Sequence, residues 1–141
     1  SFHWFNLKKT KPEFKRILKT TGKVALVWNS RHNSAAPFMK RYEKILCRYG
    51  LDYRSLKHTH VFKKLPNFFT GSPVKFRWPF TEQLTFSQVK GRLLSTSYSP
   101  PKSHPNFSPM LIQLKKDFTK FSADKKTITM YYWTHLFVGQ L

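Results

Sequence analysis

The stretch EFKRILKTTGKVALVWNSR, residues 13–31, decides the fold class, because it passes from an amphipathic helix through a glycine into an apolar strand. Its first apolar residues are spaced i, i+3 and i+4, which places them on one face of a helix. Gly22 follows them and is the predicted helix stop, in the left-handed conformation that favours glycine. Residues 24–28 form an unbroken apolar run, as expected of a strand covered on both faces. The stretch therefore predicts half of an α/β unit with a parallel sheet.

The residues on either side of this stretch extend the α/β order. Residues 1–5 are interpreted as the exit of a strand, and Pro12 is predicted in the first turn of the helix, where its missing N–H costs no hydrogen bond. Apolar residues recur at i, i+4, i+7, i+8 and i+11 over residues 38–49, and Gly50 supplies the next stop. This second helix has the clearest pattern in the chain.

The second half of the chain adds a pair of strands. Apolar and polar residues alternate over residues 74–80, the pattern of a half-buried antiparallel strand, and Pro79 favours an edge position. Residues 127–138 form a long β-branched and aromatic run that is expected to pair with residues 74–80. Between these strands, the capping-box pattern from Thr85 to Gln88 opens a short helix.

A third amphipathic helix and an irregular region complete the organisation. Ser108 is the expected cap of this helix and Pro109 lies in its first turn. Residues 51–72 lack a clean period and are interpreted as irregular, with one short helical turn at residues 53–56. There is no internal repeat and no linker, which favours one domain over residues 1–141.

The composition predicts a packed and strongly basic domain. Hydrophobic residues make up 40% of the chain, enough for a core, and 26 Lys+Arg against 6 Asp+Glu give a formal net charge of +20, which attracts phosphate. The basic residues are scattered and Lys outnumbers Arg, so most are interpreted as solvated helix faces, and no specific nucleic-acid partner is expected. A basic nucleic-acid-binding module that stacks bases on exposed aromatic residues is the alternative function.

The cysteine and histidine content argues against a disulfide framework and a metal site. Cys47 is the only cysteine, which favours a reducing, cytoplasmic compartment. His58 and His60 have no Cys, Asp or Glu nearby in sequence, so they are interpreted as solvated loop histidines. No segment approaches the ~20 apolar residues of a membrane helix, and the first ten residues lack the pattern of a signal peptide. The sequence therefore predicts a soluble protein without a membrane partner.

Four blocks of sequence together resemble a known family. They are SFHWF at residues 1–5, EFKRILKTTGKVALVWNSR at 13–31, GRLLSTSYSP at 91–100 and ITMYYWTHLFVGQL at 128–141. The chain resembles the class I S-adenosylmethionine-dependent methyltransferases, close to small-molecule members such as trans-aconitate methyltransferase. This resemblance implies a Rossmann-like sheet flanked by helices, with one or two parallel strands and an antiparallel strand pair in this part. His3 and Trp4 would follow the fourth strand, and residues 24–28 would be the fifth.

The chain departs from that family at the cofactor site. In the family, a glycine-rich loop after the first strand and an acid after the second strand hold S-adenosylmethionine. The sequence contains neither G-x-G-x-x-G nor G-x-G-x-G. The resemblance therefore implies the C-terminal half of a methyltransferase domain, from the exit of strand four to strand seven, with most of the cofactor site missing. This fragment alone is expected to have weak or no activity.

Three residues at the start of the chain are the candidate cofactor contacts. His3, Trp4 and Phe5 follow the fourth strand of the implied sheet, and ligands of doubly wound folds bind at the carboxyl ends of strands. His3 is also the candidate catalytic base, because the unperturbed pKa of histidine lies near neutrality. Packing of a loop is the structural alternative for His3, and core packing is the alternative for Trp4.

Arg31, Arg92 and Tyr98 are the candidate substrate contacts. Arg31 comes just after the apolar strand and is a candidate partner of a substrate carboxylate, since a guanidinium binds that group with two hydrogen bonds. Arg92 and Tyr98 lie in a segment that is a candidate lid over the same pocket. A solvated arginine and a polar turn are the structural alternatives. The expected partner of the whole protein is a small-molecule methyl acceptor.

Overall fold

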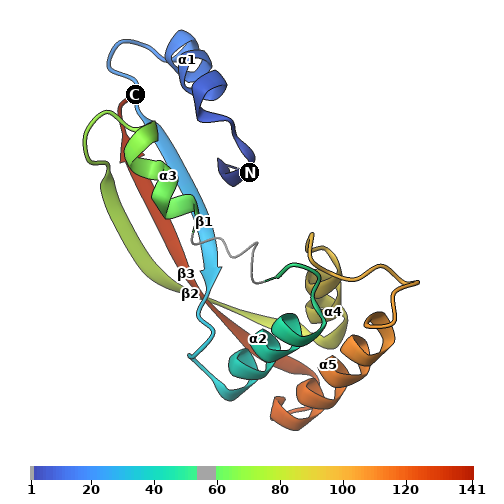
Figure 1. The fold of residues 1–141 in the computed structure, drawn as a ribbon. Helices are drawn as coiled ribbons and strands as arrows, with labels where there is room; N and C mark the ends of the chain where they lie inside the picture. The colour runs from blue at the N-terminus through green and yellow to red at the C-terminus, as the bar shows by residue number, and fades with distance from the viewer. Residues whose placement is uncertain (1, 54–59) are drawn as a thin grey trace. The chain divides into compact units, whose positions relative to one another are not determined.

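A computed structural model describes residues 2–53 and 60–141, apart from the side chains of residues 3 and 60–63 (Figure 1). In chain order its elements are the 3-10 helix η1 (Phe2–Trp4), α1 (Leu7–Ile17), β1 (Val24–Arg31), α2 (Pro37–Tyr49), α3 (His60–Phe68), β2 (Val74–Thr85), α4 (Phe86–Leu94), α5 (Phe107–Phe121) and β3 (Thr127–Gly139). No helix in these described ranges combines the length and apolar character needed to cross a bilayer.

The three described strands form one sheet in the order β1-β3-β2, and β3 runs antiparallel to both of its neighbours (Figure 1). The predicted pairing of residues 74–80 with residues 127–138 is confirmed. Pro79 lies on β2, an edge strand of this sheet, as predicted. An antiparallel strand pair beside β1 is also what the methyltransferase resemblance implies. A parallel neighbour for β1 is not seen among the described strands and stays a prediction.

Only one face of β1 is covered in the described structure. Val24 is buried and Leu26 and Trp28 are partly buried, whereas the intervening Val27 is 61% exposed. Alternate burial is the pattern of a strand with one solvated face. The prediction that residues 24–28 are covered on both faces is therefore wrong for this chain.

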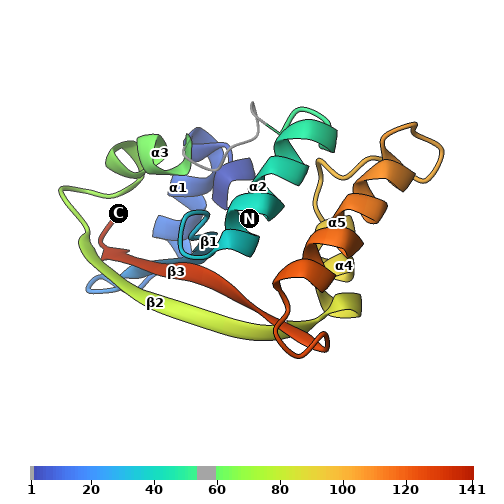
Figure 2. The same cartoon turned by 90° about the horizontal axis from the view of Figure 1, so that it is seen from below.

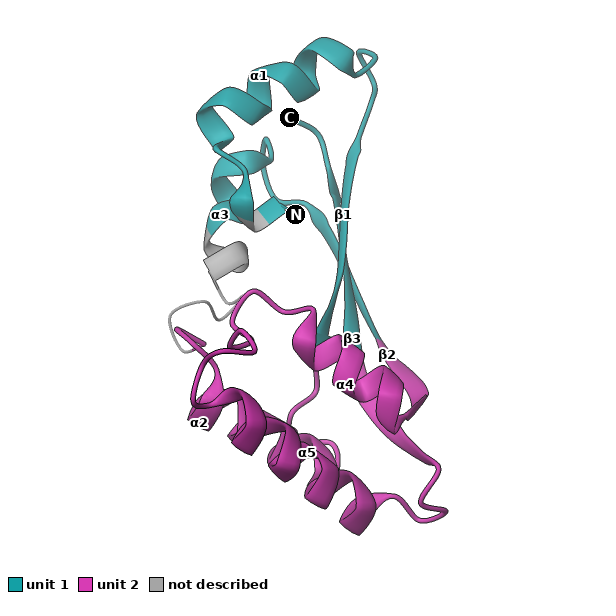
Figure 3. Cartoon of the chain, turned by 90° about the vertical axis from the view of Figure 1, so that its right-hand side faces the viewer, with its two compact units in different colours: residues 1–30, 57–78, 133–141 teal, residues 31–56, 79–132 magenta. Residues whose placement is uncertain are grey.

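The contacts of the chain define two compact units, which are described separately (Figure 3). Unit 1 comprises residues 1–30, 57–78 and 133–141, and unit 2 comprises residues 31–56 and 79–132. This division falls inside the range assigned to one domain from the sequence. The assignment of residues 1–141 to one methyltransferase domain stays a prediction.

Unit 1 has an aromatic core. The Phe68 side chain is fully buried, and its ring lies 4.8 Å from the ring of Phe2 and 5.8 Å from the ring of Phe14. Trp28 stacks on Phe137 with ring centroids 5.1 Å apart. Phe2 belongs to η1, so the interpretation of residues 1–5 as the exit of a strand is wrong for the described residues.

The first helix is longer than the sequence pattern suggested. α1 begins at Leu7, because the Asn6 side chain accepts a hydrogen bond from the Lys8 N–H at 3.1 Å and caps the helix. Pro12 therefore lies inside α1 rather than in its first turn. Gly22 follows the end of α1 at Ile17 without a left-handed φ, so its predicted conformation is also wrong.

A backbone carbonyl oxygen lies so close to Gly22 and to Gly50 that a side chain would not fit, and this closeness, rather than an unusual φ angle, explains both glycines. A Cβ atom at Gly22 would lie 2.8 Å from the carbonyl oxygen of Lys19, and one at Gly50 would lie 2.6 Å from the carbonyl oxygen of Leu46. Gly50 caps α2 with an ordinary φ of −70°. Both positions exclude larger residues because the preceding turn passes too near them.

Unit 1 also contains a helix in the region that was interpreted as irregular. α3 occupies residues 60–68, and Leu65, Phe68 and Phe69 at its end are buried in the aromatic core. The spacing of these apolar residues at i, i+3 and i+4 is helical, but Pro66 and the neighbouring lysines obscured it. The predicted turn at residues 53–56 falls mostly outside the described residues.

Unit 2 is a helical layer built on α2 and α5, which lie side by side (Figure 2). The predicted helix over residues 38–49 is confirmed as α2, whose buried face matches the predicted apolar stripe. The capping box of Thr85 and Gln88 is confirmed at the start of α4. α5 begins at Phe107 with Asn106 at the cap position, so the prediction of Ser108 as the cap is wrong.

The core of unit 2 is mainly aliphatic. Its fully buried aliphatic side chains come from α2, α4, α5 and β3, and they are Met39, Ile45, Leu46, Val89, Leu93, Met110, Leu114 and Met130. Even-numbered residues of β3 from Ile128 to Tyr132 face this core. The period of two along this part of β3 therefore follows directly from packing against the helices.

A carboxylate closes the turn between α5 and β3. Asp124 accepts hydrogen bonds from the backbone N–H groups of Thr127 and Lys126, both at 2.9 Å, and from the hydroxyl of Ser122 at 3.1 Å. The Thr127 and Lys126 bonds favour the charged form and lower the pKa of Asp124 to about 2.

The Asp124 turn predicts a specific acid sensitivity. The pKa of Asp124 is lower in the folded chain than in the unfolded chain, so its contribution to stability is present above pH ~4 and is lost as the pH falls towards 2. Urea unfolding of the chain at several pH values is expected to show this loss. In Asp124→Asn the decline over the same interval should be smaller; identical declines in both proteins would contradict the assignment.

Candidate functional site

Arg31 at the end of β1 lies among three tyrosines of unit 2. Its Nη1 donates a hydrogen bond to the Tyr98 hydroxyl at 3.2 Å, and its Nη2 donates one to the Tyr53 hydroxyl at 3.1 Å. The Arg31 Cζ atom lies 5.6 Å from the centroid of the Tyr42 ring. These four residues are called the Arg31 cluster. Its tyrosines are all buried, whereas Arg31 is partly exposed.

The Arg31 cluster holds a positive charge without a direct carboxylate partner. Among the described residues, no carboxylate forms an ion pair with Arg31; Glu43 instead accepts a hydrogen bond from the Tyr53 hydroxyl. Burial raises the pKa of Tyr42 and Tyr53 above the ordinary value of a phenol, so both hydroxyls keep their protons at neutral pH. The cluster therefore combines one cation with neutral phenols.

Two polar atoms of the Arg31 cluster have no hydrogen-bond partner in the described part of the chain. They are Nε of Arg31 and the hydroxyl oxygen of Tyr42, and both atoms are buried. A buried polar group without a partner costs about 1–3 kcal/mol, so such groups are rare in folded proteins. This makes the cluster a candidate for binding a polar ligand.

Arg92 forms a second cationic site, which has its own counterion. Its guanidinium pairs with Glu82 and donates a hydrogen bond to the Tyr132 hydroxyl, with 3.2 Å between Nη2 and the Glu82 Oε1 atom. Burial raises the pKa of the Tyr42 phenol, and the positive charges of Arg31 and Arg92 partly oppose that rise. The structure therefore joins Arg31 directly to Tyr98, whereas Arg92 is held by an internal ion pair.

The candidate cofactor contacts are placed only in part. Trp4 lies in η1 and is 67% exposed, while Phe5 packs with ring centroids 6.1 Å from Phe2 and 6.4 Å from Phe14. The side chain of His3 lies outside the described residues, as do the side chains of His58 and His60. No group of three or more His, Cys, Asp and Glu side chains suited to a metal ion occurs within the described part of the chain.

Trp4 and Phe5 provide a limited test of the fit to S-adenosylmethionine. Trp4 presents indole surface that a ligand can contact, whereas packing in the aromatic core accounts for the position of Phe5. Neither residue supplies the backbone approach that a glycine-rich loop gives in Rossmann-like sites. The cofactor contacts of Trp4 and Phe5 therefore stay a prediction.

A hydroxyl–imidazole pair in unit 1 was missed by the sequence analysis. The Oγ atom of Ser30 lies 2.7 Å from Nε2 of His135, and the imidazole stacks on Trp28 with ring centroids 5.8 Å apart. Burial, assisted by the charge of Arg77, lowers the pKa of His135. Its neutral form is thus favoured at neutral pH. Because 105 residues separate Ser30 from His135, no local sequence motif could predict the pair.

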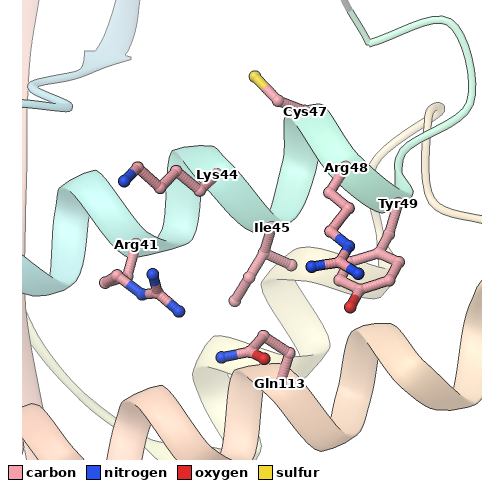
Figure 4. Close-up of a pocket in the computed structure, with 7 residues that line it drawn as sticks. All are labelled: Arg41, Lys44, Ile45, Cys47, Arg48, Tyr49 and Gln113. Carbon is pink, nitrogen blue, oxygen red and sulfur yellow. The ribbon is translucent and has the colours of Figure 1, made fainter.

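A basic pocket of about 310 Å³ lies between α2 and α5 in unit 2 (Figure 4). Its lining residues are Arg41, Lys44, Ile45, Cys47, Arg48, Tyr49 and Gln113. The three cations repeat at i, i+3 and i+7 along α2, which places them on one side of the helix. None of the six residues proposed from the sequence lines this pocket. It is therefore distinct from the Arg31 cluster.

Comparison with known proteins connects the chain to methyltransferases. No family model matches the chain. Over 97 residues it is 32% identical to the Uncharacterized methyltransferase-like C25B8.10 of Schizosaccharomyces pombe, covering 69% of this chain and 38% of that protein. Over 93 residues it is 36% identical to the Uncharacterized methyltransferase C25B8.09 of the same yeast, covering 63% of this chain and 32% of that protein.

The chain spans about a third of the length of the curated relatives it matches. The strand order β1-β3-β2 is compatible with the partial methyltransferase sheet that the sequence resemblance implies. The two independent findings, sequence similarity and strand order, agree with each other. Together they make the chain similar to methyltransferases over part of their length.

Proposed function

We propose that this chain is the C-terminal part of an S-adenosylmethionine-dependent methyltransferase that acts on a small molecule. The similarity to two methyltransferase-like proteins of fission yeast carries this proposal. The antiparallel pair β3-β2 beside β1 supports it, because the same arrangement is implied by the resemblance of the sequence to class I enzymes. A nucleic-acid-binding role has the scattered basic charge and exposed aromatic residues such as Trp4, Phe76 and Trp78 in its favour, but the two relatives in fission yeast do not point to it.

In the proposed reaction, the main contribution of the protein is to orient the methyl acceptor towards the methyl group of the cofactor. S-adenosylmethionine, when bound, would supply the electrophilic methyl group. His3, Trp4 and Phe5 are proposed to contact the cofactor, and His3 is proposed to accept the proton of the methyl acceptor. A second set of residues is proposed to hold the acceptor in line and to exclude water from it, namely Arg31, Arg92 and Tyr98.

Binding of S-adenosylmethionine by a longer product of the same gene tests this function. Isothermal titration calorimetry is expected to detect binding when the upstream coding sequence is included, and weak or no binding by the 141-residue chain. Trp4→Ala in the longer protein is expected to weaken binding about tenfold. Trp78→Ala, which alters another exposed tryptophan, is the control. Two results would each contradict the proposal: an upstream sequence that lacks a glycine-rich loop, or a longer protein that does not bind S-adenosylmethionine.

A further inference from the structure

We infer that the basic pocket between α2 and α5 binds a small molecule that carries a phosphate monoester group. The pocket has a volume of about 310 Å³, and all of its lining residues belong to unit 2 (Figure 4). Its described lining includes none of the residues proposed to contact the cofactor or the methyl acceptor. The site is therefore independent of the proposed function.

Two of the three cations that line the pocket have no counterion in the described part of the chain. Neither Lys44 nor Arg48 forms an ion pair with a described carboxylate. Arg48 instead lies over the Tyr49 ring, with its Cζ atom 5.3 Å from the ring centroid. Like charges four residues apart on a helix repel each other, so the grouping of Lys44 and Arg48 is unfavourable until an anion joins them.

Arg41 adds hydrogen-bond donors to the pocket, although Asp117 balances its charge. The Nε atom of Arg41 donates to both carboxylate oxygens of Asp117 at 3.2 Å, and no described acceptor bonds its two Nη atoms. Figure 4 shows the Arg41 and Arg48 side chains directed from α2 towards α5, where Gln113 lies opposite them. Arg41 can therefore donate to a ligand from Nη while it keeps the internal ion pair.

No carboxylate is among the described residues that line the pocket. The Asp117 side chain is only 4% exposed, and it accepts hydrogen bonds from Arg41 and Gln113. Glu43, an acid of α2, accepts a hydrogen bond from the Tyr53 hydroxyl. An anion in the pocket would therefore meet two positive charges that no described carboxylate pairs with, and this charge favours a dianion.

A phosphate monoester matches these features better than a carboxylate or a phosphodiester. It carries a charge of about −1.5 to −2 at pH 7 and three acceptor oxygens, and a guanidinium binds it with two parallel hydrogen bonds. A carboxylate or a phosphodiester has one negative charge, which would leave one of the two cations unmatched. Ile45 and Tyr49 also line the pocket and offer apolar surface to the organic part of the molecule.

Isothermal titration calorimetry of the 141-residue chain with phenyl phosphate tests the site. Phenyl phosphate is expected to bind saturably, and dimethyl phosphate, a phosphodiester, is expected to bind at least about tenfold more weakly. Lys44→Gln and Arg48→Gln are each expected to weaken the binding of phenyl phosphate about tenfold, because each removes one charged hydrogen-bond donor.

Lys90→Gln is the matched control, because it removes the same charge from an exposed position on α4 that does not line the pocket. It is expected to bind phenyl phosphate like the parent chain. Lys44→Gln and Arg48→Gln leave the hydrogen bonds from Arg41 to Asp117 in place, so both variants are expected to keep the unfolding midpoint of the parent.

Phosphate monoesters occur in soluble molecules and in the headgroup of phosphatidic acid. Co-sedimentation with phosphatidylcholine vesicles that contain phosphatidic acid distinguishes these two sources. For a soluble ligand, the parent chain and Arg48→Gln are expected to bind the vesicles equally, through general charge attraction. Weaker vesicle binding by Arg48→Gln would assign the ligand to the lipid headgroup, and both results keep the phosphate monoester as the bound group.

Three outcomes would overturn the phosphate site. The first is no saturable binding of phenyl phosphate. The second is equal affinity for phenyl phosphate and dimethyl phosphate, as expected of a surface that binds the phosphodiester backbone of a nucleic acid. The third is an equal loss of binding in Lys90→Gln and Lys44→Gln, which would mean that the net charge of +20 alone attracts the probe.

Discussion

Phe118→Ala is expected to lower the free energy of unfolding of unit 2 by about 3–5 kcal/mol, the usual cost of removing a buried aromatic ring. The Phe118 side chain is 2% exposed, and its ring lies 6.4 Å from the ring of Phe38 and 5.5 Å from the ring of Phe86. These contacts connect α5 to both α2 and α4. Truncation would leave a cavity where the three helices meet, because a packed core relaxes only partly around a missing ring.

Hydrogen exchange measured by mass spectrometry can assign this loss to unit 2. Peptides from α2 and α5 are expected to exchange faster in Phe118→Ala, since their opening free energy falls. Tryptophan fluorescence gives a separate signal for unit 1, because the tryptophans at positions 4, 28, 78 and 133 all lie there. Ile112→Ala on the same helix is the control, as Ile112 is 69% exposed; an equal effect of both variants would contradict the packing argument.

Local patterns predicted the elements whose signals lie within a few residues. The stripe of α2 and the capping box of Thr85 and Gln88 depend on spacings of three and four residues, and both are confirmed. The pairing of β2 with β3 followed from two runs of residues with strand character and an antiparallel end implied by resemblance. The stripe, the capping box and the strand character of each run are encoded by neighbouring residues, so the sequence alone reveals them.

The errors came from interactions that sequence spacing does not express. α1 starts five residues before Pro12 because Asn6 caps it, and a proline is tolerated inside α1. Gly22 was assigned a left-handed conformation, although the steric closeness of a preceding carbonyl explains the glycines at both 22 and 50. The apolar run of β1 suggested cover on two faces, but burial depends on which helices pack against it.

In the candidate site too, the sequence predicted individual residues but not the contacts between residues that are far apart in the chain. Arg31 and Tyr98 were both proposed from the sequence, and their hydrogen bond joins positions 67 residues apart. Tyr42 satisfied the apolar period of α2, so nothing in the pattern marked its hydroxyl as unpartnered. Tyr53 lay in the region interpreted as irregular. Their grouping around one guanidinium became visible only through the tertiary structure.

Arg41→Met is expected to destabilise unit 2 by about 3 kcal/mol, because it leaves a buried carboxylate without its cation. The Asp117 side chain is only 4% exposed, and Nε of Arg41 donates to both of its oxygens at 3.2 Å. Gln113 also donates to Asp117 at 3.0 Å, but an amide does not neutralise the charge. The Arg41 side chain is 40% exposed, so the low end of the range for buried pairs applies.

The double variant Arg41→Met with Asp117→Leu separates the ion pair from simple packing. Replacing a buried pair by apolar residues is often neutral, so the double variant is expected to regain most of the stability that Arg41→Met loses. Urea unfolding followed by far-ultraviolet circular dichroism measures both changes. Arg48→Met is the matched control, since that guanidinium lies 5.3 Å from the Tyr49 ring and is expected to contribute less than about 1 kcal/mol. If the double variant were less stable than Arg41→Met, packing by the Asp117 side chain, rather than its unpaired charge, would dominate.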